Sequence, residues 1–83
     1  MSAKNKVIAG DYVGASVTLV NEQVTLAIKL GHMIILNKKM VASHAVESEV
    51  KGDHKVSVTF ADGKKSLLEL DDKMCNALLK QLF

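Results

Sequence analysis

The chain has 83 residues, of which 48% are hydrophobic, with a formal net charge of +2 and no proline. This length makes one domain, in which a smaller share of the surface is buried than in a large protein. The single cysteine excludes an intramolecular disulfide, and no apolar run approaches the roughly 18 residues that span a bilayer. No signal-peptide pattern follows the polar start, so we expect a cytoplasmic protein without a transmembrane segment.

The basic residues are informative because all eleven are lysines. Bidentate recognition of guanine edges or phosphates relies on arginine, and single-stranded nucleic acids need aromatic stacking surfaces. The chain has no arginine and only three aromatic residues, Tyr12, Phe60 and Phe83. We therefore expect no specific nucleic-acid binding, and lysines that solvate the surface and protect sheet edges.

Strand patterns fill the N-terminal half. Residues 1–6 are expected to be a polar tail, followed by a short strand at 7–9 and a turn at 10–11. Apolar residues then recur at every second position through 13–19 and, after a turn at 21–23, through 24–30. A period of two predicts half-buried strands. These two segments should form an antiparallel hairpin with the following side chains inward: Val13, Ala15, Val17, Leu19, Val24, Leu26, Ile28 and Leu30.

Two further strands have an ambiguous register. Met33–Leu36 is four apolar residues long, and a change of one residue in the preceding loop would reverse its faces. We favour Ile34 and Leu36 on the inner face. In Val41–Val50 either Ala42, His44 and Val46 or Val41, Ser43 and Ala45 face inward, and the exposed glutamates indicate an edge strand.

The C-terminal third has the clearest patterns. Alternation at 56–60 predicts a sixth strand with Val56, Val58 and Phe60 inward, and an Asp62-Gly63 turn leads into a seventh at 65–70.

A helix follows these strands. Its apolar residues share one stripe and its polar residues the opposite face. The stripe contains Met74, Cys75, Leu78, Leu79 and Leu82, and the polar face Lys73, Asn76, Lys80 and Gln81. Asp71 or Asp72 is expected to cap the helix, although adjacent carboxylates also suit Mg²⁺ or Ca²⁺.

These elements predict a mainly β (α+β) fold of about seven antiparallel strands capped by one C-terminal helix. This order of elements is that of a pleckstrin-homology-like barrel, which would occupy residues 7–83 as a single domain. A plain β-sandwich with an appended helix is the alternative.

Two segments resemble a widespread family of short, uncharacterised proteins from bacteria and their phages. They run from Lys6 to Ala15 (KVIAGDYVGA) and from Phe60 to Lys73 (FADGKKSLLELDDK), about a third of the chain, and Leu36-Asn37-Lys38 is a weaker third match. Family members have a Gly/Ala-rich apolar insertion where this chain has only residues 50–54, so no role of that insertion, such as membrane contact, is carried over. This family resemblance supplies no catalytic motif. More distantly, the order of elements is similar to that of bacterial pleckstrin-homology-like domains, a resemblance that implies a homo-oligomer.

Several residues offer chemistry, each with a structural alternative. Asp53-His54 is either a base with its orienting carboxylate or a hairpin tip, and His44 is either a pH-sensitive group or an edge residue. Cys75 is either a redox thiol or a small core residue. The serines lack a nucleophile-elbow context, Gly10 and Gly14 are too far apart for a phosphate loop, and the histidines and cysteine lack zinc-ligand spacing. We expect no enzyme, cofactor or metal.

Three functions remain. The excess of apolar residues without a catalytic cluster favours a non-enzymatic, homo-oligomeric protein-interaction module with an unidentified protein partner. The alternative is a small-ligand or anion binder, for nucleotides or lipid headgroups, in which Lys38, Lys39, Lys64 and Lys65 converge on neighbouring loops. The distribution of the resembling family adds a third hypothesis, a phage-related inhibitor of a host defence protein.

Overall fold

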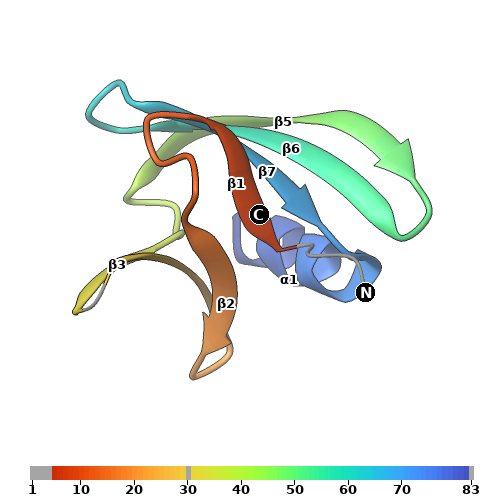
Figure 1. Cartoon of the computed structure of the whole chain (residues 1–83), viewed down its shortest axis with the longest axis horizontal. Helices are drawn as coiled ribbons and strands as arrows, with labels where there is room; N and C mark the ends of the chain where they lie inside the picture. Colours follow the sequence, from red (N-terminus) through yellow and green to blue (C-terminus); the bar gives the residue numbers. More distant parts are fainter. Residues whose placement is uncertain (1–4, 30, 83) are drawn as a thin grey trace.

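The computed structural model describes residues 5–29 and 31–82, apart from the side chain of Lys29. Residues 1–4 of the expected tail, Leu30 of the second long strand and Phe83 lie outside the described residues. The strands and helix are β1 (Lys6–Gly10), β2 (Ser16–Val20), β3 (Gln23–Lys29), β4 (His32–Ile35), β5 (Val41–Val50), β6 (Asp53–Phe60), β7 (Lys65–Leu70) and α1 (Asp72–Leu82). All seven strands pair antiparallel in one sheet (Figure 1).

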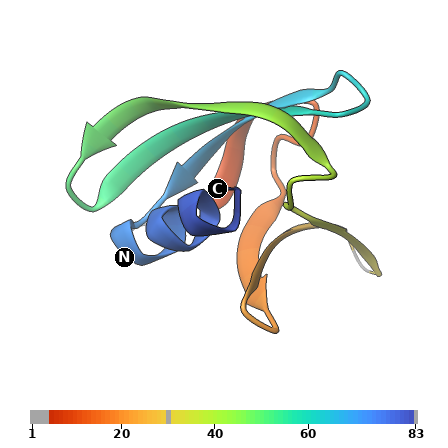
Figure 2. The ribbon, with the colours of Figure 1, turned by 180° about the vertical axis from the view of Figure 1, so that it is seen from behind.

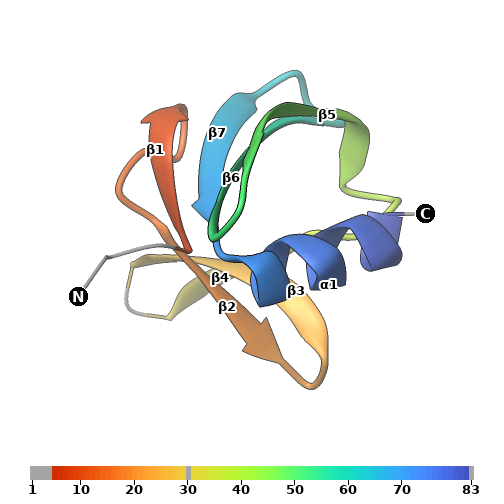
Figure 3. The same ribbon diagram turned by 90° about the vertical axis from the view of Figure 1, so that its right-hand side faces the viewer.

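The predicted fold class is confirmed: the chain is mainly β, with seven antiparallel strands and one C-terminal helix. The strand order is β4-β3-β2-β1-β7-β6-β5, and the sheet is bent but not closed. The expectation of a closed barrel, or of two stacked sheets, is therefore wrong. The helix α1 lies between the β5–β7 part and the β2–β3 part of the sheet (Figures 2 and 3) and contacts β3, β6 and β7. It therefore keeps the two end strands of the sheet apart.

The sheet bends where β1 joins its two halves. A bulge interrupts the β1–β7 register between Val7 and Ala9. At Gly10, φ is +101°, and a Cβ added there would overlap the Lys65 carbonyl oxygen and lie 2.7 Å from the Ser66 Cα. Only glycine fits at this close approach of β1 to its neighbour β7.

The inner face carries a single core. It consists of Val7, Ala15, Val17, Val24, Leu26, Leu36, Val41, Val56, Val58, Phe60, Leu68, Leu70, Met74, Cys75, Leu78 and Leu82. Ala15 and Val17 are buried as predicted, but Val13 is 62% exposed because residues 11–14 form a turn before β2 begins. Leu19 is 40% exposed near the end of β2, so the inward pattern of that strand holds only in its first half.

The structure resolves both ambiguous registers. Leu36 is fully buried and Ile34 packs against the core, whereas Met33 and Ile35 are exposed, as favoured from the sequence. In β5 neither alternation holds throughout, because bulges interrupt the pairing with β6 between Val41 and Ser43 and between Val46 and Ser48. Each bulge adds a residue and shifts the side chains that follow to the other face.

The helix stripe is confirmed, with Met74, Cys75, Leu78 and Leu82 buried and Leu79 packed against the core. Gln81 was expected on the polar face, and this expectation is wrong. Its side-chain oxygen accepts a 2.7 Å hydrogen bond from the Val24 N–H, and its side-chain nitrogen donates to the Leu36 carbonyl. The Gln81 amide thus joins the end of α1 to β3 and to the end of β4.

Candidate functional site

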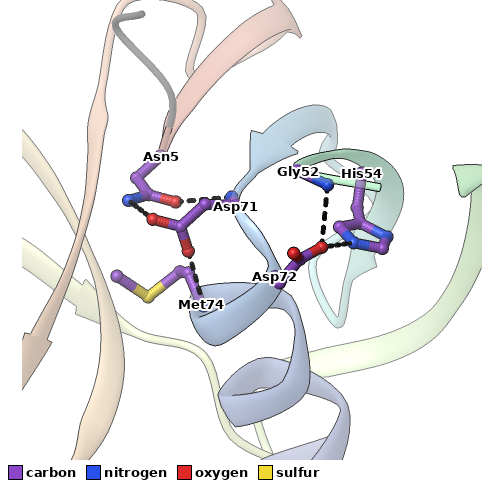
Figure 4. Close-up of polar contacts among 6 residues, drawn as sticks. All are labelled: Asn5, Gly52, His54, Asp71, Asp72 and Met74. Carbon is purple, nitrogen blue, oxygen red and sulfur yellow. Dashed lines mark hydrogen bonds and ion pairs between the residues drawn. The ribbon is translucent and has the colours of Figure 1, made fainter. Parts of the chain in front are cut away.

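The junction between β7 and α1 gathers the acidic pair predicted from the sequence (Figure 4). Asp71 is the N-cap, because its Oδ1 accepts a 2.8 Å hydrogen bond from the Met74 N–H. The Asn5 amide completes this cap: it donates to Asp71 Oδ2 and accepts from the Asp71 N–H, each at 3.0 Å. The cap interpretation is confirmed, and the Asp71 carboxylate links the start of β1 to the start of α1.

Asp72 binds a different part of the chain. Its Oδ1 accepts a 2.9 Å hydrogen bond from the Gly52 N–H, in the turn between β5 and β6, and also contacts His54 Nε2 (Figure 4). The Gly52 N–H first, and then the His54 ring, hold the pKa of the Asp72 carboxyl below its ordinary value. Asp72 therefore fastens the β5–β6 hairpin to the first turn of α1.

The carboxylate beside His54 is thus Asp72, while Asp53 lies 3.6 Å from the Lys55 ammonium. A general base needs a ring nitrogen that can reach its substrate. His54 Nδ1, the nitrogen that does not face Asp72, is buried without a hydrogen-bond partner. The geometry therefore supports the hairpin-tip alternative, in which His54 and Asp72 hold two elements together.

Cys75 lies one turn into the helix and is 3% exposed. Burial raises the pKa of its thiol, and the nearby Glu49 and Asp72 carboxylates raise it further. A nucleophilic or redox-active cysteine needs the opposite environment, accessible and electropositive. This supports the interpretation of Cys75 as a core residue.

His44 lies on β5 opposite Val58, a buried residue of β6, and is itself half-buried. Among the described residues, no group of three or more His, Cys, Asp or Glu side chains is placed to hold a metal ion.

The four candidate lysines lie on two loops that touch. Lys38 and Lys39 are exposed in the β4–β5 loop, and Lys64 and Lys65 are exposed where the β6–β7 turn enters β7. The loops meet where the Ala61 N–H donates to the Met40 carbonyl at 2.8 Å.

Acidic groups occupy the β6–β7 side of this lysine region. The Lys64 N–H donates to Asp62 Oδ1, and the Lys65 N–H donates to Asp11 Oδ2. The Lys64 ammonium lies 3.9 Å from Asp62 and 5.6 Å from the centre of the Tyr12 ring. These contacts balance the positive charge locally, so this turn is a weak anion site by itself.

Lys65 also lines a shallow hollow of about 430 Å³ on the outer face of the sheet, with Glu47 and Ser57 among its other lining residues. Leu67, which is half-buried, also lines this hollow.

The remaining feature is an excess of exposed apolar side chains. Among the residues that the structure describes, eight large hydrophobic side chains are more than a third exposed. Four of them lie on the end strands of the sheet: Met33 and Ile35 on β4, and Val46 and Val50 on β5. The exposure of Met33 and Ile35 follows from the register favoured for that strand, whereas the exposure of Val46 was not predictable, because one of the two alternations considered for 41–50 places it inward.

Within the described part of the chain, no helix is both long enough and apolar enough to cross a membrane. Comparison of the sequence with family models and curated proteins, and of the structure with solved structures, finds no match.

Proposed function

We propose that the chain is a non-enzymatic protein-interaction module that associates with copies of itself. One observation carries the proposal: the sheet is open, and its end strands β4 and β5 expose apolar side chains. An unpaired strand offers a row of backbone hydrogen-bonding groups, and exposed apolar residues beside it favour association.

The chemistry of the polar clusters supports a role without catalysis. The His54–Asp72 contact has its second ring nitrogen buried, and the Cys75 thiol is buried with a raised pKa. Seven antiparallel strands followed along the chain by one C-terminal helix are the elements expected for a pleckstrin-homology-like domain, and we propose this relationship on that basis.

Size-exclusion chromatography coupled to light scattering tests self-association directly. We expect a mass above that of one chain, rising with protein concentration, because association follows mass action. A mass of one chain at all concentrations would refute self-association.

A second candidate is anion binding at the touching lysine loops, favoured by the Met40–Ala61 contact that brings them together. Nucleotides and phosphoinositide headgroups should then raise the melting temperature, and the quadruple replacement of Lys38, Lys39, Lys64 and Lys65 by Ala should abolish the rise. No shift with any of these anions would remove this candidate.

A further inference from the structure

The two end strands of the sheet, β4 and β5, differ in the charged residues on and beside them. Among the described residues, β4 has only β3 beside it and β5 has only β6 beside it. We propose that these two edges are the two halves of one interface, so that β4 of one copy adds to β5 of the next copy. This inference rests on the proposed self-association and specifies which surfaces meet.

Charge selects this pairing over the others. From His32 to Met40, β4 and the loop after it contain Lys38 and Lys39 and no carboxylate. β5 contains Glu47 and Glu49 and no lysine, and the turn after it begins with Lys51; all five of these charged side chains are exposed. Pairing two β4 edges offers the lysines of the following loops no carboxylate, and pairing two β5 edges offers the glutamates only Lys51 of the turn after β5. Pairing β4 with β5 places the glutamates of one copy against the two-lysine loop of the next.

The edges also differ in how they are protected. β5 has two bulges and two glutamates, which are devices that discourage indiscriminate pairing of an edge strand. β4 contains no lysine, aspartate or glutamate, and it exposes Met33 and Ile35, at 52% and 40%. The β4 edge is therefore open to pairing with an added strand. An extended strand that contains both acidic and apolar residues would complement it. The chain itself provides such a segment at the end of β5, in Val46–Val50, where a bulge interrupts the strand at Glu47.

The resulting contact is heterologous, because two different surfaces of the same chain meet. Backbone hydrogen bonds would continue the sheet from one copy into the next, as in β-strand addition. The interface would cover Met33, Ile35, Val46 and Val50, which are half of the exposed large hydrophobic residues in the described part of the chain.

Two charge-reversed variants test the pairing. One carries Lys38→Glu and Lys39→Glu, and the other carries Glu47→Lys and Glu49→Lys. Each retains one native edge, so each alone should associate about tenfold more weakly than the wild type at low salt, as measured by light scattering and sedimentation. An equimolar mixture should recover association, because the native β4 of one variant meets the native β5 of the other, and the two reversed edges also match.

Matched controls reverse charges away from both edges. Glu22→Lys in the β2–β3 turn and Lys73→Glu on the helix change exposed residues and should leave association unchanged. Circular dichroism confirms folding of each variant. Should either variant fail to fold, wild-type association measured against salt gives a second test, because screening must weaken a charge-selected interface.

The outcomes separate the two proposals. If the wild type associates but either variant does so equally well, or if the mixture fails to recover, the β4–β5 pairing is refuted while self-association stands. Wild-type association that does not depend on salt also refutes the pairing. If the wild type remains a single chain, self-association itself is refuted.

Discussion

Replacing Gln81 by Met tests the attachment of the helix to the sheet. Methionine keeps an unbranched side chain of similar length but removes both polar groups of the amide. The Val24 N–H and the Leu36 carbonyl would then lose their partners, and both residues are fully buried. The two backbone groups already belong to neighbouring strands, since the Leu36 N–H donates to the Val24 carbonyl at 2.8 Å.

The magnitude follows from the cost of unpaired buried groups. Each buried donor or acceptor left without a partner costs about 1–3 kcal/mol, so two cost about 2–6 kcal/mol. If β3 and the end of β4 move closer, so that the Val24 N–H donates directly to the Leu36 carbonyl, the loss of stability lies at the lower end of this range. We therefore expect a loss of about 2–4 kcal/mol, which is a large share of the roughly 5–15 kcal/mol that holds a typical domain folded.

Urea unfolding followed by far-UV circular dichroism measures this loss. The melting temperature should fall by roughly 8–32 °C, given about 4–8 °C per kcal/mol for a domain of this size. Asn76→Met and Lys80→Met are matched controls, because both residues are exposed on the polar face of the same helix. A change within about 0.5 kcal/mol for Gln81→Met, the range of ordinary surface substitutions, would refute the reasoning.

Three further predictions address the bend, the thiol and the helix start. Gly10→Ala should cost about 3 kcal/mol or more by urea unfolding because of the overlap with β7, whereas Gly14→Ala, also at positive φ but facing open space, should cost only about 1 kcal/mol; equal losses would contradict this. Native Cys75 should react with a thiol reagent far more slowly than the urea-unfolded chain, and equal rates would show an accessible, ionised thiol. Because the folded pKa of Asp72 lies below its ordinary 3.8, its charge stabilises the fold fully above that pH and loses this effect as pH falls through the folded pKa. The stability difference between wild type and Asp72→Asn should therefore shrink in acid, and a constant difference would contradict it.

Regular patterns made much of the fold predictable. Strands were recognisable where apolar residues alternate without interruption, as in 56–60, and the helix where they form one stripe. The Asp71 cap was predictable because capping involves residues three positions apart, a local interaction. The favoured register of Met33–Leu36, with Ile34 and Leu36 inward, was correct. All four residues are apolar, so the sequence has no alternation there that would have required this register.

The features that the sequence patterns did not reveal depend mostly on contacts that are remote in sequence. Gln81 shares a polar face with Lys80 in the sequence pattern, and only the docked helix brings its amide to Val24, 57 positions away. His54 has an aspartate beside it in the sequence, yet its partner is Asp72, 18 positions away. The β5 bulges also have no marker in the sequence, because Ala42 and Glu47 fit a regular strand as well as a bulge.

The position of α1 connects the stability of the fold with its open edges. Closing the sheet would require β4 and β5 to lie about 4.8 Å apart over their length. A helix with its side chains is about 10–12 Å across, and α1 lies between β3 on one side and β6 and β7 on the other (Figure 3). The helix therefore fills the space between the two parts of the sheet, and the sheet cannot close into a barrel around it. Gln81 fixes this arrangement by bonding to Leu36 where β4 ends, so the interaction that stabilises the helix also leaves β4 and β5 available to another strand.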